Sequence, residues 1–247
     1  MLHLDSIPGL HDITVQIEFT KNGKVAYRGN TFIGYIGLPT IQRPSGWGMS
    51  ADSRFNGGGV DILEGIAVAK KGGKTIGVFM RDVAEASATY TEAIQALNDT
   101  LLIAPAYFIT SGVAPGEGAV VTRGREGPDN SAHEGIWSLD LPAAWWRLET
   151  NYDHWEPSQD GRRAAANAMM RKIGRKDIGF DSLLKLLSTA PVLASDTLYT
   201  TLMRHDTNEY RSIIRSHNKT RPEGPAVGKP FAYFEALRVA MVQAGMI

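Results

Sequence analysis

Side chains that could perform chemistry are concentrated between residues 147 and 163 of this 247-residue chain. Asn151, Asp153 and His154 bring an amide, a carboxylate and an imidazole close together, and Arg162 and Arg163 follow. Such groups can stabilise a developing charge, transfer a proton or hold a metal ion. Three interpretations therefore compete: a catalytic strand end, a metal cluster, or a polar turn between two elements.

A metal site would need residues from distant parts of the chain. The six histidines are scattered, and none forms a His-x-x-x-His pair. A metal hydrolase would have to bring Asp153, His154 and His205 together through the tertiary structure. We therefore predict no metal or other cofactor.

Other catalytic motifs are incomplete. Gly72-Gly-Lys-Thr75 has the end of a phosphate-binding loop, but Val68 occupies the position of its first glycine. No Gly-x-Ser-x-Gly sequence occurs, and the chain contains no cysteine to act as a nucleophile or thiolate ligand. Its 26 basic and 26 acidic residues cancel, which gives no electrostatic argument for a nucleic-acid partner.

The elements that must position these side chains come in pairs. Residues 14–19 and 25–31 alternate like half-buried strands, and Lys21-Asn-Gly-Lys24 between them is typical of a hairpin turn. Further expected strands are 106–110, 118–123, 135–139, 145–150, 197–203 and 209–215, and expected helices are 60–69, 76–84, 90–97, 160–172, 180–188 and 232–244. Neighbouring strands and neighbouring helices predict an α+β protein with antiparallel sheets.

Two regions are expected from the chain's composition. Residues 1–218 would form one domain, and 219–247 would form a Pro/Gly linker with a short C-terminal helix. Residues 39–59 are rich in Pro, Ser and Gly and suggest irregular structure. No apolar run reaches membrane-spanning length, and no signal peptide is visible at the start.

The segment Thr150-Asn-Tyr-Asp-His-Trp155, followed by Arg162-Arg163, resembles a segment of the N-acylethanolamine acid amidase and acid ceramidase family. Several other blocks match in the same order, and they are residues 21–37, 102–109, 116–123, 187–192 and 198–202. The resemblance covers about residues 13–218 and leans toward the N-acylethanolamine amidase branch.

This resemblance implies the catalytic β-subunit of an N-terminal-nucleophile hydrolase, folded as an αββα four-layer sandwich. Such enzymes cleave fatty-acid amides, N-acylethanolamines or ceramides, in a lysosomal or secretory compartment. The resemblance further implies that Asn151 donates a hydrogen bond to the oxyanion and that Arg162 orients the site. Trp145, Trp146 and Tyr152 are candidates for contacts with the N-acyl lipid.

The chain departs from the family where the nucleophile should be. The family's cysteine and a Gly-Arg-Asn-x-Asp segment precede the first hairpin, but Met1–Asp12 contains neither Cys nor Arg. Ser53 stands at the position of a family glutamate. We therefore expect a fold without its nucleophile-bearing strands, an unpaired sheet edge beside Thr14–Phe19 and no activity in the isolated chain.

Two outcomes follow from this departure. A complementary chain or an N-terminal segment could supply the cysteine and complete an amidase. Alternatively, the chain is a non-catalytic relative that binds lipid amides or acts as a scaffold.

Overall fold

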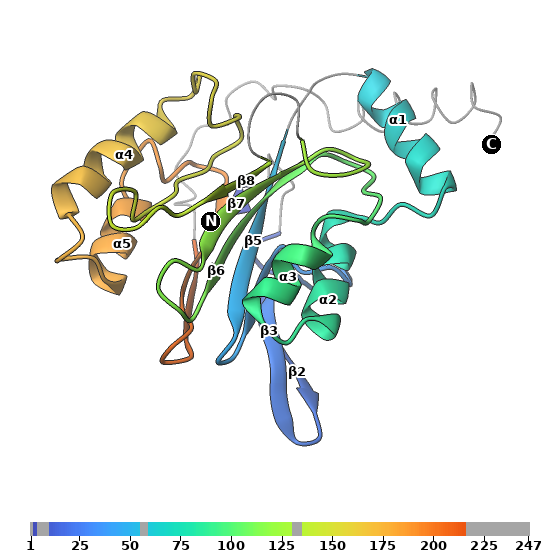
Figure 1. Cartoon of the computed structure of the whole chain (residues 1–247), viewed down its shortest axis with the longest axis horizontal. Helices are drawn as coiled ribbons and strands as arrows, with labels where there is room; N and C mark the ends of the chain where they lie inside the picture. Colours follow the sequence, from blue (N-terminus) through green and yellow to red (C-terminus); the bar gives the residue numbers. More distant parts are fainter. Residues whose placement is uncertain (1, 4–9, 55–58, 130–134, 216–247) are drawn as a thin grey trace.

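The computed structural model describes residues 2–3, 10–54, 59–129 and 135–215, and these form two antiparallel sheets with helices outside them (Figure 1). The larger sheet has the order β2-β3-β4-β5-β6-β7-β8, and the smaller has the order β1-β9-β10. The strands are β1 (Leu2–His3), β2 (Thr14–Lys21), β3 (Lys24–Phe32), β4 (Thr40–Arg43), β5 (Trp47–Ser53), β6 (Ala106–Gly112), β7 (Gly118–Arg123), β8 (Ile136–Ser138), β9 (Thr197–Arg204) and β10 (Glu209–Ile214). The helices are α1 (Gly59–Lys70), α2 (Ile76–Ala86), α3 (Tyr90–Ala96), α4 (Arg162–Ile173) and α5 (Phe180–Leu187).

The predicted first hairpin is confirmed. Asn22 and Gly23 have φ angles of 53° and 72°, as a two-residue turn between twisted strands requires. Phe19 and Tyr27 pair across the two strands, and their rings stack with centroids 4.5 Å apart. Among the described strands, β2 lies at one end of the larger sheet.

Strands β4 and β5 correct the expectation of irregular structure after residue 39. Trp47, Met49 and Ala51 alternate along β5 and are buried in the main core. Ser50 and Asp52 therefore point to the opposite face of the sheet, since successive side chains of a strand alternate. The sequence signal was weak because β4 is only four residues long and β5 contains Gly48 and Asp52, residue types of low strand propensity, and tertiary burial overrides it.

Helices α2 and α3 cover one face of the larger sheet. Phe79, Met80 and Val83 of α2 are fully buried in the core formed with β4, β5 and β6. Helix α3 begins with a capping box, in which Thr89 and Glu92 satisfy each other's backbone N–H groups. These helices form the outer layer on that side of the molecule.

The two sheets pack face to face through polar as well as apolar contacts. Thr40 Oγ1 lies 2.9 Å from the hydroxyl of the buried Tyr199, and Asn30 donates to Thr201 Oγ1 at 3.0 Å. Helices α4 and α5 lie on the opposite side of the sheets from α2 and α3 (Figure 1). The expected four-layer αββα sandwich is therefore confirmed.

Some expected elements differ from the structure. Residues 145–150 were expected to form a strand, but they have no regular secondary structure. The helix expected from residue 160 begins at Arg162, with Gly161 as its N-cap. Residues 219–247, expected as a linker and helix, lie outside the described residues. Among the described helices, none has both the length and the apolar character needed to cross a membrane.

Candidate functional site

Asn151 is held by two elements that are distant in sequence. Its Nδ2 donates to the main-chain oxygen of Ser53, the last residue of β5, at 2.9 Å. Arg162 Nη2 donates to Asn151 Oδ1 at 2.8 Å. Because a guanidinium can only donate, it must face the amide oxygen, and this fixes the orientation of the amide. One amide hydrogen is committed to Ser53, and the other has no hydrogen-bond acceptor among the described residues.

Arg162 is itself fixed at the start of α4. Asp160 Oδ1 accepts from the Arg162 main-chain N–H at 3.0 Å and from the Ser158 hydroxyl at 2.8 Å. The other oxygen of Asp160 accepts from Arg162 Nε. Burial alone would raise the pKa of Asp160, but these hydrogen bonds hold it below its usual value. The carboxylate therefore stays ionised and keeps Arg162 directed at Asn151.

Ser53 contributes its main-chain oxygen, whereas the carboxylate comes from its neighbour. The Ser53 side chain is exposed, and Asp52 lies on the face of β5 that points toward the smaller sheet. Burial raises the pKa of Asp52 to about 6, against the attraction of the chain's N-terminal ammonium and of the Arg162 charge. Asp52 therefore places a carboxyl group one position before Ser53, the residue that we expected at the position of a family glutamate.

Glu149 is a second buried carboxyl group, two residues before Asn151. Its side chain is 0% exposed, and its Oε1 accepts from the Thr150 N–H at 2.8 Å and from Arg163 at 3.2 Å. Burial raises its pKa to about 7, helped by the negative charges of Asp52 and Asp153. Its Oε2 is buried and makes no hydrogen bond within the described part of the chain.

Arg163 ties the loop that carries Asn151 to helix α4. Its Nη1 donates to the main-chain oxygens of Asp153 and Glu156 at 3.0 and 2.9 Å. Its Nη2 reaches the main-chain oxygen of Tyr152 as well as Glu149. The two consecutive arginines therefore have different roles: Arg162 orients the Asn151 side chain, and Arg163 binds the main-chain oxygens of the surrounding loop.

Arg54 anchors the same loop from the end of β5. It donates two hydrogen bonds of 2.7 Å to Asp153, and it forms a 2.6 Å ion pair with Asp129. The Tyr107 hydroxyl also donates to Asp153 at 2.6 Å. Arg54 is only 8% exposed, so the bidentate pair is largely screened from water. This network fixes the position of the loop two residues beyond Asn151.

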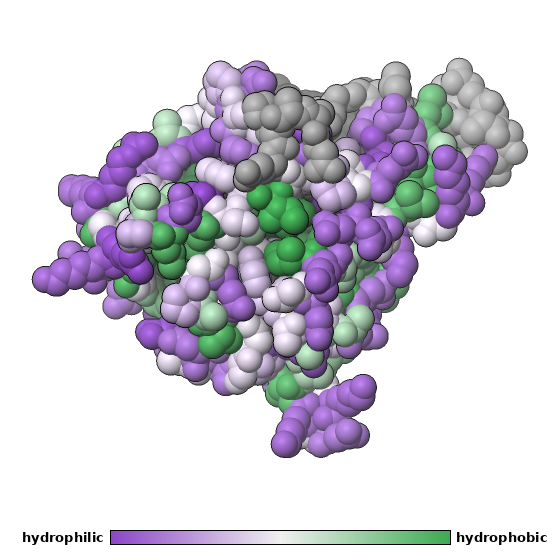
Figure 2. All heavy atoms as spheres, in the orientation of Figure 1, coloured by the Kyte–Doolittle hydropathy of each residue, from purple (hydrophilic) through white to green (hydrophobic). Residues whose placement is uncertain are grey.

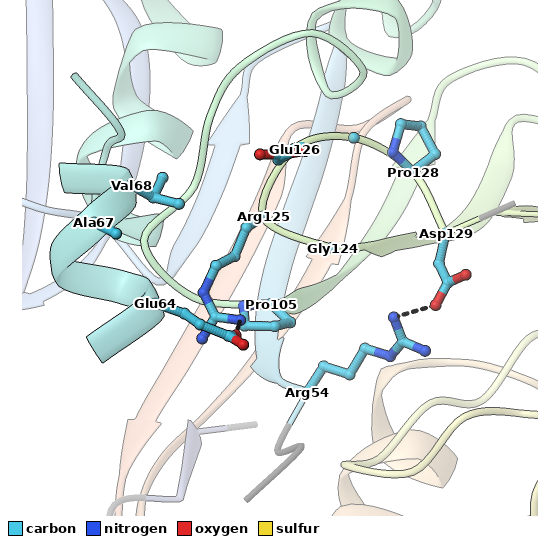
Figure 3. A pocket seen from close by; sticks show the side chains of 11 residues that line it. Arg54, Glu64, Ala67, Val68, Pro105, Gly124, Arg125, Glu126, Pro128 and Asp129 are labelled. Atoms are coloured by element: carbon cyan, nitrogen blue, oxygen red, sulfur yellow. Dashed lines mark hydrogen bonds and ion pairs between the residues drawn. The ribbon is translucent and has the colours of Figure 1, made fainter. Parts of the chain in front are cut away.

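A cavity of about 660 Å³ opens beside Arg54. Figure 3 shows Arg54 and Asp129 paired on one side and Arg125 with Glu64 of α1 on the other. Both arginines are compensated by carboxylates, and Glu126 adds a further acidic group to the lining. The cavity is therefore acidic and does not favour an anionic ligand.

The expected lipid-contact residues Trp145, Trp146 and Tyr152 all lie near Asn151, but they make contacts of different kinds. Trp145 and Trp146 were expected on opposite sides of a strand, yet their rings are in contact, with centroids 4.8 Å apart. Both pack against the small core beneath α4 and α5, and Trp146 Nε1 donates to Asn167 at 3.1 Å. Tyr152 contributes its main-chain oxygen, which accepts a hydrogen bond from Arg163. Figure 2 shows that hydrophilic residues cover much of the outer face around α4 and α5.

The residues proposed for a metal hydrolase are occupied by other contacts. Both oxygens of Asp153 accept from Arg54. His154 stacks on Trp137 with ring centroids 4.2 Å apart, and His205 lies 2.7 Å from Ser111. Across the described residues, no group of three or more His, Cys, Asp or Glu side chains could hold a metal ion.

The Ser111–His205 pair does not form a nucleophile and base. Arg28 donates to Gln42 Oε1, so Gln42 presents its NH₂ group, 3.4 Å away, to His205 Nδ1. Nδ1 must then be the acceptor, and Nε2 carries the hydrogen donated to Ser111. Burial also lowers the pKa of His205 and keeps it neutral. We assign this pair a structural role between β6 and the turn after β9.

Comparison with known proteins identifies relatives over most of the chain. The chain is 39% identical over 211 residues to the N-acylethanolamine-hydrolyzing acid amidase of Cavia porcellus, covering 84% of this chain and 58% of that protein. It is 35% identical to the acid ceramidase of Homo sapiens, covering 83% of this chain and 52% of that protein. No family model matches.

A solved structure extends this similarity to the fold. The Caenorhabditis elegans N-acylethanolamine-hydrolyzing acid amidase ortholog matches with a TM-score of 0.75 and 32% identity, covering 87% of this chain and 92% of that chain. The layered antiparallel sheets and this structural match define an N-terminal-nucleophile-hydrolase-like fold. The chain belongs to the N-acylethanolamine-hydrolyzing acid amidase and acid ceramidase family. It spans between half and three fifths of the length of the curated relatives it matches.

Three residues of this region were not selected from the sequence. Arg54 and Asp52 flank Ser53, and Glu149 immediately precedes the Thr150–Trp155 block, but the sequence around a charged residue does not show which residue it will pair with. Their burial is the property that matters here, and it depends on strands β5 and β6 and helix α4 packing together.

Proposed function

We propose that this chain forms the oxyanion-binding part of an amidase that cleaves the amide bond of N-acyl lipids, either N-acylethanolamines or ceramides. The observation that carries the proposal is the geometry of Asn151. Its amide is fixed by Ser53 and Arg162, and one N–H is left without an acceptor in the described structure. The names of the related amidases and ceramidases support the substrate class.

Asn151 would act by stabilising charge that develops on the amide oxygen. When a nucleophile adds to the carbonyl, the oxygen becomes an oxyanion, and a preorganised N–H donor lowers the energy of that state. Arg162 would polarise the Asn151 amide by donating to its oxygen, and it would prevent the amide from rotating. Trp145, Trp146 and Tyr152 would line the region where the lipid enters.

The nucleophile would come from a cysteine that this chain does not contain. The family resemblance implies an N-terminal cysteine whose own α-amine accepts the thiol proton. A preceding segment or a complementary chain would carry this residue next to Asn151. The second candidate function, a non-catalytic binder of lipid amides, is favoured by the lack of cysteine and by Ser53 in place of glutamate.

The site also fits an acidic compartment, the lysosomal or secretory location that we propose by resemblance. Asp52 and Glu149 have pKa values raised to about 6 and about 7 by burial. Both groups therefore hold protons in an acidic lumen, where the buried region carries less uncompensated charge.

The test supplies the missing nucleophile. A segment carrying the family's cysteine and Gly-Arg-Asn-x-Asp motif is fused before residue 1, and release of palmitate from N-palmitoylethanolamine and from a ceramide is measured. Asn151→Ala should lower kcat by about 100- to 1,000-fold. The matched control, Asn22→Gly at the tip of the first hairpin, should retain activity.

Two results would count against the amidase proposal. Asn151→Ala with unchanged kcat would remove Asn151 from the oxyanion site. A correctly folded fusion that binds N-palmitoylethanolamine without hydrolysing it would favour the non-catalytic binder.

A further inference from the structure

One indole, that of Trp137 in β8, contacts both ends of the loop that carries Asn151. The His154 ring stacks on this indole, with ring centroids 4.2 Å apart and an interplanar angle of 7°. The Arg147 guanidinium carbon lies over the same indole, 4.6 Å from its centroid. Arg147 precedes Asn151 by four residues and His154 follows it by three, so the two ends of this short loop meet on a single ring.

The larger sheet fixes the position of this indole. Trp137 pairs with Val120 of β7, Val120 pairs with Ile109 of β6, and Ile109 pairs with Ser50 of β5. Residues that pair directly across neighbouring strands share one face of a sheet. Trp137 therefore projects from the same face as Ser50, which is the face directed away from the main core and toward the smaller sheet.

Polar contacts hold the Asn151 loop near β5 and β6. Asn151 donates to the main-chain oxygen of Ser53 at 2.9 Å, and the Tyr107 hydroxyl of β6 donates to Asp153 at 2.6 Å. Trp137 acts three strands away from β5, which at the usual strand spacing is about 14 Å across the sheet. The loop is thus attached to the sheet at two separated places, and the stack on Trp137 is the aromatic one.

A second indole connects this stack to the Arg54 network. The Trp155 ring meets His154 edge-on, with centroids 4.7 Å apart and an interplanar angle of 79°. Arg54, which binds Asp153, places its guanidinium carbon 5.9 Å from the centroid of the Trp155 ring. Both arrangements of the His154 ring, stacked and edge-on, are favourable for aromatic pairs. His154 is therefore fixed between two indoles.

We propose that Trp137 is a positioning residue for Asn151. Its indole holds the two ends of the loop together, and this limits how far Asn151 can move over the sheet. Arg162 orients the Asn151 amide, whereas Trp137 sets the distance of that amide from Ser53. In this arrangement His154 contributes a flat ring that stacks, and its part in the site does not require proton transfer or metal binding.

Nuclear magnetic resonance tests the positioning on the chain as it exists. The side-chain NH₂ group of Asn151 gives two proton signals, which Asn151→Ala identifies by their loss. One of these protons donates to Ser53, so its chemical shift reports that contact. We expect Trp137→Leu to move this signal toward that of a free asparagine amide. Trp137→Phe keeps an aromatic ring and should restore most of the original shift.

His154 provides a second, independent pair of variants. His154→Ala removes the ring that stacks on Trp137 and should move the Asn151 signals in the same direction as Trp137→Leu. His154→Phe keeps a flat ring without ring nitrogens and should leave the signals close to those of the unaltered chain. This pair gives the same comparison if Trp137→Leu does not fold.

Ile136 is the matched control for a general loss of stability. It is the neighbour of Trp137 in β8, and it packs against the main core on the opposite face of the sheet. Ile136→Ala should therefore lower the thermal midpoint and leave the Asn151 signals unmoved. Circular dichroism confirms that each variant is folded.

The consequence for catalysis rests on the proposed function. In the protein fused to the family's cysteine segment, Trp137→Leu should lower kcat by about 10- to 100-fold, because displacement of a catalytic group by about 1 Å can have an effect of this size. KM should change by less than about twofold. In an Asn151→Ala background, Trp137→Leu should lower kcat no further, since the group that it positions is absent.

Three results would overturn the proposal. They are Asn151 signals that stay in place in folded Trp137→Leu, equal movement of these signals in Ile136→Ala, and additive losses of kcat in the double variant. A fused protein without amidase activity would instead count against the proposed function. The Asn151 signals would still decide the role of Trp137, because they are measured without a substrate.

Discussion

Replacement of Arg54 by methionine should destabilise the fold strongly. Arg54 makes two 2.7 Å hydrogen bonds to Asp153 and a 2.6 Å ion pair with Asp129, and these carboxylates are only 17% and 20% exposed. Methionine keeps much of the packing volume but removes the Arg54 guanidinium from both carboxylates. Breaking such a buried pair typically costs about 3–5 kcal/mol.

Urea denaturation, followed by tryptophan fluorescence and circular dichroism, measures this cost. A loss of about 3–5 kcal/mol in the free energy of unfolding should be visible as a lower midpoint with an unchanged slope. Asp153→Asn in the same background completes a double-mutant cycle. The two changes should be strongly non-additive, because each removes the other's partner.

A surface pair provides the control. Lys74 and Asp82 form an ion pair and are each 43% exposed, so Lys74→Met should cost at most about 1 kcal/mol. High salt should reduce that small effect and leave the Arg54 effect largely intact, because buried pairs are less screened. If Arg54→Met costs less than about 1 kcal/mol, the network does not hold the Asn151 loop as described.

Three further outcomes are expected from the structure. The pKa of Glu149 is raised to about 7 from an ordinary 4.5, which means that the folded state holds this proton more tightly than the unfolded state. The contribution of Glu149 to the free energy of unfolding should therefore fall by about 3 kcal/mol as the pH rises from 4.5 to 7. Glu149→Gln should flatten that slope in pH-dependent urea melts. Thr89→Ala removes the cap of α3 and should lower the free energy of unfolding by about 1 kcal/mol; an unchanged thermal midpoint would contradict the capping role. Gly29→Ala would place a Cβ 2.1 Å from the Thr40 main-chain oxygen and should lower the free energy of unfolding by about 3 kcal/mol in the same assay. A Cβ at Gly179 meets no atom within 4 Å, so Gly179→Ala should cost only a few tenths of a kcal/mol. Equal losses in the two variants would refute the steric argument.

Local patterns in the sequence predicted those elements whose residues show clear alternation, turn signals or an apolar helix face. The Asn22-Gly23 turn, its two flanking strands and the amphipathic helix α5 have such patterns, and the structure confirms them. Strands β4 and β5 have none, because β4 is only four residues long and β5 contains Gly48 and Asp52, which form a strand here only when neighbouring strands pair with them.

The sequence blocks identified the family and pointed to Asn151 and Arg162, since the order and spacing of those blocks are properties of the chain itself. The contacts that give these residues their geometry were decided by tertiary structure. Ser53 meets Asn151 from 98 positions away, and Arg54 reaches Asp153 across a similar distance in sequence.

Burial was likewise decided only by packing. Glu149 is an ordinary acidic residue in the sequence, and the layers around it make it a fully buried carboxyl group with a raised pKa. The loss of water around a charge depends on every element that encloses it, so no local pattern could have predicted the raised pKa of Glu149.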